Sequence, residues 1–271
     1  MYQPLFLLCL LCAAPAFAAL PAPVTDTIDG RRVESLTIRH PVSRDVVVFE
    51  AGSRNTIDKW GEVPERLART ASVFAYNRPG YGNSEAVTTP RDGRTIVEEL
   101  RAALRFKGLR PPYVLVGHSL GGLYMQLFAR AYPDEVKALV LVDALYPGMV
   151  KKPQDFPLLT RLSGRLAFSP SVWREIEQID ATGEMVARLP TIDDKPVVKL
   201  MNQPVSSTAI AVDFGAFRMD DATRAATRAL YPNARKVIVD SSHQMALTSP
   251  DTVTGAIEQI LAPTTPALVG P

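Results

Sequence analysis

Hydrophobic residues in this chain form short, nearly continuous runs, separated by longer stretches in which they recur every three or four positions. Six of the short runs are rich in strand-forming residues and are bounded by glycine, proline or aspartate, as β-strands are. They cover residues 44–50, 72–77, 112–116, 136–142, 197–201 and 236–239. Residues 113–116 are apolar at every position, which predicts strands buried on both faces of a sheet.

The longer stretches between these runs have helical spacing. Residues 95–106 place Ile96 and Leu100 on one face, residues 120–132 are apolar nearly all round, and residues 251–261 repeat apolar positions at helical intervals. Alternation of strands and helices predicts an α/β fold with a mostly parallel central sheet and helices on both faces. Ligands of such sheets bind at the carboxyl ends of the strands.

Residues 147–190 interrupt the alternation. This segment has no strand pattern, but residues 172–179 and 183–189 have helical patterns. We interpret it as a small helical cap over the carboxyl edge of the sheet, because structureless connections of this length are uncommon. The alternative is an ordinary long surface connection.

The two ends of the chain differ from the rest. Residues 1–25 carry no charged side chain, residues 5–14 are almost wholly apolar, and Ala-Phe-Ala follows at residues 16–18. This pattern predicts a signal peptide at residues 1–18 and a secreted or periplasmic protein without stable membrane insertion after cleavage. The alternative is an uncleaved anchor. We expect one domain over residues 19–262 and a disordered tail, rich in proline and threonine, at residues 263–271.

Composition excludes several functions. Cys9 and Cys12 both lie in the predicted signal peptide, so the mature chain would have no disulfide, thiolate nucleophile or cysteine metal ligand. The net charge of +2 is small and basic residues are scattered, which gives no reason to expect nucleic acid as a partner. Neither a phosphate-binding glycine pattern nor clustered metal ligands are present, so we expect no cofactor and no metal.

The first candidate for chemistry is Ser119. Residues 117–121 have the pattern Gly-x-Ser-x-Gly between a buried strand and a buried helix, which is the setting of a nucleophile elbow. Such a turn is tight, so it needs small residues at Gly117 and Gly121. The amide of Leu120, at the start of the helix, would point to where an oxyanion forms.

A serine nucleophile needs a base, and the chain has three histidines. His118 adjoins Ser119, and neighbouring side chains diverge at a sharp turn. His40 lies near the first strands and fits a surface role. His243 follows the strand at residues 236–239 and therefore lies at the same sheet edge as Ser119, which makes it the predicted base.

The third member of a triad is a carboxylate that orients the histidine. Asp143 ends the strand at residues 136–142, at the correct edge, and Asp213 lies in a later loop; both precede His243 in the chain. The strand ending at Met201 has no carboxylate at its tip, so we favour Asp143 and keep Asp213 as the alternative. The Ser53 amide, after Gly52, is the predicted second oxyanion donor.

Together these segments resemble the α/β-hydrolase family, in its branch with a single domain and a small cap. The resemblance covers residues 38–261 and rests on residues 50–53, 77–84, 117–122, 139–143 and 242–243. It implies hydrolysis of esters, lactones, amides or related acyl compounds through an acyl-enzyme. Two segments depart from the family: residues 51–52 are Ala-Gly where His-Gly is frequent, and residues 202–205 lack the acid that many members carry there.

We therefore predict a secreted serine hydrolase that acts on a small-molecule acyl substrate with Ser119, His243 and Asp143. The alternatives are perhydrolysis or aminopeptidase chemistry on the same residues, and a binding protein that has lost catalysis. The apolar cap residues Phe156, Leu158, Leu159, Phe168 and Trp173 fit either a hydrophobic acyl site or the packing of the cap on the core.

Overall fold

The structure is a computed structural model that describes residues 21–203, 215–218 and 220–262. The predicted signal peptide, the predicted tail and Asp213 lie outside the described residues. From β3 onward, strands and helices alternate as the sequence predicts, and two further strands, which the sequence analysis did not predict, precede β3. No helix among the described residues is long and apolar enough to cross a membrane.

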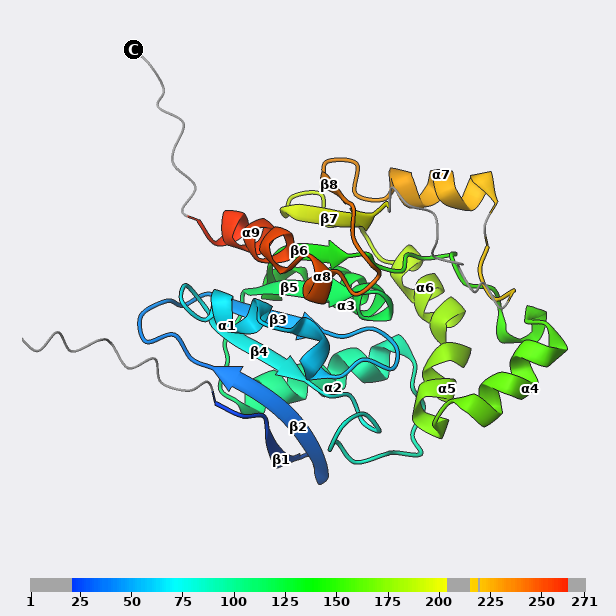
Figure 1. The fold of residues 1–271 in the computed structure, drawn as a ribbon, viewed down its shortest axis with the longest axis horizontal. Coiled ribbons are helices and arrows are strands. Elements are labelled where there is room, and N and C mark those ends of the chain that lie inside the picture. Colours follow the sequence, from blue (N-terminus) through cyan, green and yellow to red (C-terminus); the bar gives the residue numbers. More distant parts are fainter. Residues whose placement is uncertain (1–20, 204–214, 219, 263–271) are drawn as a thin grey trace, which may run out of the picture.

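The described strands form one eight-stranded sheet in the order β1-β2-β4-β3-β5-β6-β7-β8 (Figure 1). The first two strands pair antiparallel and the remaining ones run parallel to one another. The bounds are β1 Val24–Ile28, β2 Arg31–Ile38, β3 Val46–Glu50, β4 Ser72–Tyr76, β5 Tyr113–His118, β6 Val136–Val142, β7 Val197–Asn202 and β8 Arg235–Val239. The prediction of a mostly parallel sheet is confirmed.

Helices cover both faces of the sheet. One face carries α2 Gly93–Phe106, α3 Leu120–Ala131 and α6 Ile179–Arg188, and the other carries η1 Ile57–Trp60, α1 Val63–Leu67, α8 Met245–Thr248 and α9 Pro250–Leu261. The short turn η2 Pro133–Glu135 and the exposed helix α7 Asp221–Ala229 complete the elements outside the cap, and a second short turn, η3 Pro153–Asp155, lies at the start of the cap segment.

The strand sequence explains the two-sided core. Successive side chains of a strand point to opposite faces. Val46 and Val48 of β3 accordingly pack in the cluster under α2 and α3, whereas Val47 and Phe49 pack in the cluster under α1 and α9. All five residues of β3 are buried, which is why the strand is apolar without alternation up to Glu50.

The cap contains α4 Leu158–Ala167, α5 Pro170–Glu177 and α6, to the right of the sheet in Figure 1. The expectation that Leu158 and Leu159 would fill an acyl site or hold the cap to the core is wrong. Their side chains are 64% and 77% exposed, because they lie on the outer face of α4.

Candidate active site

Ser119 occupies the turn between β5 and α3 and has a φ of 52°, in the left-handed region that non-glycine residues rarely adopt. The surrounding backbone holds it there. Its N–H donates to the carbonyl of Val142 at 3.1 Å, and its own carbonyl accepts the N–H of Leu145 at 2.9 Å. Both partners lie in or just after the neighbouring strand β6, so the sheet edge fixes the turn.

Glycines allow the close packing that this turn requires. A Cβ atom on Gly121 would lie 2.1 Å from the carbonyl oxygen of Glu50, and one on Gly122 would lie 2.3 Å from Cβ of Ala144. Real Cβ atoms do not approach other atoms so closely. The start of α3 can therefore lie against the ends of β3 and β6 only with glycine at both positions.

The carboxylate and the imidazole that the sequence singled out are in direct contact. Asp143 follows β6 with a φ of 41°, and His243 lies between β8 and α8. Nδ1 of His243 and Oδ2 of Asp143 are 2.7 Å apart. The other carboxylate oxygen accepts the backbone N–H of Asn202 at 3.4 Å, so strand β7 also orients Asp143.

One cavity brings these groups together. Its volume is about 470 Å³, and Ser119, Asp143 and His243 line it together with Ser53 and Leu120. The remaining lining is mostly apolar and comes from the cap and the segments beside it. It includes Met149, Phe156, Phe168, Trp173, Ile176 and Phe217. A largely apolar wall excludes water and strengthens electrostatic interactions inside the cavity.

The loop after β3 lies beside the serine. A Cβ atom on Gly52 would lie 3.0 Å from Cβ of Ser119, so the loop backbone passes close to Ser119. Ser53, the next residue, lines the cavity, and its Oγ is buried without a hydrogen-bond partner in the described part of the chain. The sequence had singled out only the amide of Ser53, because nothing in the sequence indicated the position of its hydroxyl group.

His118 is part of a buried network behind His243. Its Nε2 lies 2.7 Å from the carbonyl oxygen of His243, and its Nδ1 lies 3.2 Å from the side-chain amide of Asn55. The same amide donates to Oε1 of Gln244 at 3.2 Å. A neutral ring with its proton on Nε2 satisfies both contacts, since it donates to the carbonyl and accepts from the amide. Asn55 and Gln244 carried no signal in the sequence.

Burial, followed by the nearby His243, lowers the pKa of His118 from its ordinary value of 6.5 to about 4. Between these two values the unfolded chain binds a proton that the folded protein does not. The free energy of unfolding should therefore fall as the pH decreases through this window, by up to about 3 kcal/mol at about 1.4 kcal/mol per pKa unit. Urea unfolding at pH 7.5 and pH 4.5 measures the difference.

The variant His118→Gln is the control for this prediction. Glutamine keeps a donor for the carbonyl of His243 but cannot be protonated in this range. We expect its unfolding free energy to depend less steeply on pH than that of the wild type. Equal acid dependence in the two proteins would contradict a buried neutral His118.

A second buried network joins the loop after β3 to the cap. Nη1 of Arg78 lies 2.6 Å from both Oε1 of Glu50 and the carbonyl oxygen of Ala51, and Nη2 lies 3.0 Å from the carbonyl oxygen of Gly52. On its other side, Nη2 lies 3.0 Å from Oε2 of Glu175 in α5. The guanidinium thereby connects the backbone beside Ser53 to the cap.

All three charged side chains of this network are almost completely buried. Burial opposes the charge of Arg78, but Glu175 and then Glu50 offset it and raise the pKa of Arg78 above its ordinary value. Burial raises the pKa of Glu50 despite the nearby arginine. The sequence located Arg78 in a family-like segment but could not indicate that Glu175, 97 residues later, is its partner.

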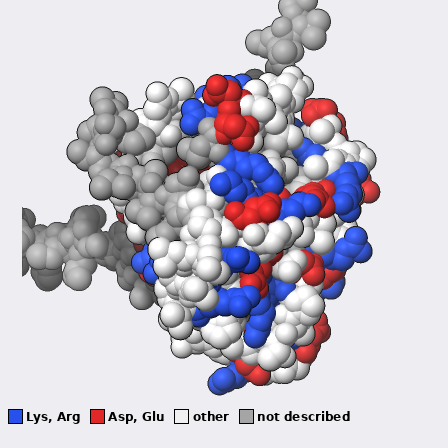
Figure 2. All heavy atoms as spheres, turned by 90° about the vertical axis from the view of Figure 1, so that its right-hand side faces the viewer, with Lys and Arg blue, Asp and Glu red and all other residues white. Residues whose placement is uncertain are grey.

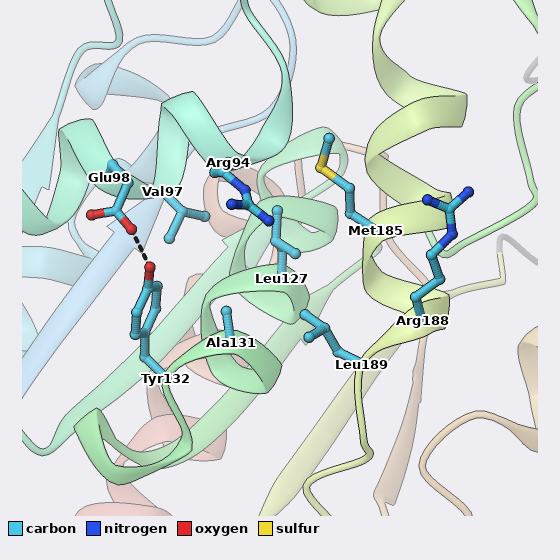
Figure 3. Close-up of a pocket in the computed structure, with 9 residues that line it drawn as sticks. All are labelled: Arg94, Val97, Glu98, Leu127, Ala131, Tyr132, Met185, Arg188 and Leu189. Atoms are coloured by element: carbon cyan, nitrogen blue, oxygen red, sulfur yellow. Dashed lines mark hydrogen bonds between the residues drawn. The ribbon is translucent and has the colours of Figure 1, made fainter.

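Another cavity, of about 280 Å³, lies between α2, α3 and α6 and is shown in Figure 3. It lies beside the far half of α3, including Leu127 and Ala131, roughly 12 to 18 Å along the helix from Ser119 at 1.5 Å per residue. Its carboxylate, Glu98, accepts a hydrogen bond from Tyr132. Neither a serine nor a histidine lines it, so this cavity does not offer the chemistry of the first.

Comparison with known proteins agrees with the fold. The family model described as the alpha/beta hydrolase fold matches residues 45–189, more than half of the chain. The chain belongs to the alpha/beta hydrolase fold family, and this membership supports a hydrolase. The resemblance predicted from residues 50–53, 77–84 and 117–122 is thereby confirmed.

Two solved structures show the same fold. An alpha/beta hydrolase fold protein from Burkholderia ambifaria has a TM-score of 0.65 and 15% identity, covering 87% of this chain and 97% of that one. A thermophilic esterase from Thermogutta terrifontis has a TM-score of 0.62 and 19% identity, covering 89% and 98%. At such identities the likeness concerns the fold alone.

Among curated proteins, "Uncharacterized protein YbdG" of Bacillus subtilis is 30% identical over 122 residues. The match covers 44% of this chain and 37% of YbdG. The chain thus matches less than half the length of this relative.

Proposed function

We propose that the protein hydrolyses a carboxylic ester or a similar acyl compound through an acyl-enzyme formed on Ser119. The observation that carries the proposal is the contact of 2.7 Å between His243 Nδ1 and Asp143 Oδ2 at the wall of the cavity that Ser119 also lines. A carboxylate bound to Nδ1 keeps the proton of a neutral imidazole on that nitrogen. Nε2 is then free to accept the proton of a serine hydroxyl.

In the proposed reaction, Ser119 Oγ attacks the carbonyl carbon of the substrate while His243 Nε2 takes its proton. The negative charge that develops on the carbonyl oxygen is bound by the amides of Leu120 and Ser53. His243 returns the proton to the leaving group, which departs as an alcohol. A water molecule then repeats the sequence on the acyl-enzyme, releasing the acid and restoring Ser119.

The apolar cavity wall supports a hydrophobic acyl or alkyl group as part of the substrate. The structure from Thermogutta terrifontis is that of an esterase, which agrees with ester chemistry on this fold. We also propose that the chain is exported, on the basis of its uncharged, apolar residues 1–18.

Labelling with a fluorophosphonate tests the proposal, because this reagent phosphonylates activated serines. We expect the intact mass of the wild-type protein to increase by a single adduct and that of Ser119→Ala to stay unchanged. The Ser53→Ala variant is the matched control for a second serine on the same cavity and should still be labelled.

A folded wild-type protein that takes up no label would refute an activated Ser119 and favour a binding protein that has lost catalysis. Labelling that persists in Ser119→Ala would assign the nucleophile to another residue. Where labelling is specific, esters and lactones assayed with and without hydrogen peroxide, together with aminoacyl amides, separate ester hydrolysis from perhydrolysis, which forms a peracid, and from aminopeptidase chemistry.

A further inference from the structure

The outer face of α4 exposes a cluster of leucines that the proposed reaction does not use. Leu158, Leu159, Leu162 and Leu166 are 64%, 77%, 55% and 89% exposed, and they form the outer leucine face of this helix. Single exposed leucines are ordinary, but an adjacent group of this size marks an interaction surface.

Helical geometry divides α4 into three faces. Leu158, Leu162 and Leu166 recur every four residues, so they line one side, which Leu159 widens. Thr160, Gly164 and Ala167 lie roughly 80–120° from the nearest of these leucines at about 100° per residue, Ser163 lies between them and Leu159, and all four line the cavity of Ser119. The helix is therefore a wall with the catalytic cavity on one side and the outer leucine face on another.

The third face is basic. Arg161 and Arg165 lie one turn apart beside the leucines, and α4 contains no acidic residue. Arg161 is half-buried, and its Nε is buried without a hydrogen-bond partner in the described part of the chain. Arg165 lies 3.4 Å from Glu177, but its side chain is 67% exposed and the pair is weak. Figure 2 shows the side of the molecule that carries the cap, where uncharged surface adjoins both basic and acidic side chains.

On α4, a row of leucines is flanked by arginines. This arrangement matches an anionic phospholipid surface, in which an apolar acyl layer lies beneath a layer of negatively charged phosphate groups. Leucine side chains partition among acyl chains, and arginines at the border bind phosphates. A protein partner would satisfy the leucines equally well, but the arginines without acidic neighbours on α4 favour an anionic surface.

We propose that α4 docks on the surface of anionic phospholipid, with its leucines in the acyl layer and Arg161 and Arg165 at the phosphates. The opposite face of the same helix then presents the cavity of Ser119 next to the lipid. The substrate class follows from this docking together with the proposed function, on which it rests. It is an acyl compound carried by a membrane lipid.

Vesicle sedimentation tests the docking with the Ser119→Ala protein, so that no lipid is consumed. We expect this protein to bind phosphatidylglycerol vesicles more tightly than phosphatidylcholine vesicles. The double variant Leu162→Ser, Leu166→Ser should bind about tenfold more weakly, because it loses two leucine side chains that would insert into the acyl layer of the vesicle. Replacing Arg161 and Arg165 by glutamine should weaken binding to phosphatidylglycerol and reduce its dependence on salt.

Val42→Ser is the matched control. Val42 is 84% exposed, and it precedes β3, whereas the cap covers the opposite, carboxyl edge of the sheet. We expect this variant to bind vesicles as the parent protein does. Turnover of a soluble short-chain ester by the leucine variant, in the background with Ser119 intact, should stay unchanged, which shows that its fold and site are intact.

Three outcomes would overturn the proposal. One is that the parent protein binds neither kind of vesicle, and another is that the leucine variant binds as strongly as the control. The third is a dimer in sedimentation equilibrium that the leucine variant abolishes, which would assign the surface to a second copy. Since vesicle binding is measured without Ser119, a failure of the proposed function would be seen separately, as absent fluorophosphonate labelling.

Discussion

We expect Asp143→Asn to lower kcat by about four orders of magnitude, the effect typical of replacing the acid of a Ser-His-Asp triad. Asp143 Oδ2 lies 2.7 Å from His243 Nδ1 and can only accept a hydrogen bond when ionised. An asparagine amide can instead donate to Nδ1, which places the imidazole proton on Nε2. In that tautomer His243 cannot take the proton of Ser119.

Asp213→Asn is the matched control, because the sequence alone left both aspartates as candidates for the acid. We expect it to retain most of the wild-type kcat on an ester that the wild type turns over. The reverse ranking of the two variants would move the acid to the later loop. Circular dichroism of both variants separates lost chemistry from lost structure.

The second large effect concerns stability. We expect Glu175→Ala to lower the free energy of unfolding by about 3–5 kcal/mol, because it leaves the buried charge of Arg78 without its partner in the cap. Arg91, also fully buried, lies 3.6 Å from Glu175 and loses a counterion as well. Urea unfolding at neutral pH, compared with the wild type, measures the loss.

Glu184→Ala provides the control for this change. Glu184 pairs with Arg188 on the surface of α6, where the two side chains are 45% and 75% exposed, and such pairs contribute at most about 1 kcal/mol. Equal, small losses in Glu175→Ala and Glu184→Ala would contradict a stabilising role for the buried network. We further expect Glu175→Ala to slow fluorophosphonate labelling, since Arg78 also holds the carbonyls of Ala51 and Gly52.

Part of the site could be predicted from sequence because its signals are local. The turn at Ser119 is enclosed by a strand, a helix and two glycines that lie within six residues of one another. The backbone of this segment is shaped by its own neighbours, so the position of Ser119 at the sheet edge follows from the printed sequence. Asp143 was located in the same way, by its position directly after an apolar strand.

Contacts between distant segments had no such signal. Asn55 and Gln244 are 189 residues apart and hydrogen-bonded, and both are ordinary polar residues in the sequence. The partnership of Arg78 with Glu175 likewise depends on where the cap lies over the sheet. The apolar character of Leu158 and Leu159 was misleading, because apolar residues can lie on an exposed helix face as well as on a buried one.

The sequence by itself determined the class of fold and the positions of the six strands β3 to β8, whereas β1 and β2 were not predicted. Apolar runs without alternation are stable only as strands covered on both faces, and that requirement leaves few architectures. Only the tertiary structure decided which carboxylate contacts His243, which charges are buried under the cap and which leucines face outward. These properties depend on how segments far apart in the chain pack against one another, and local periodicity does not encode that packing.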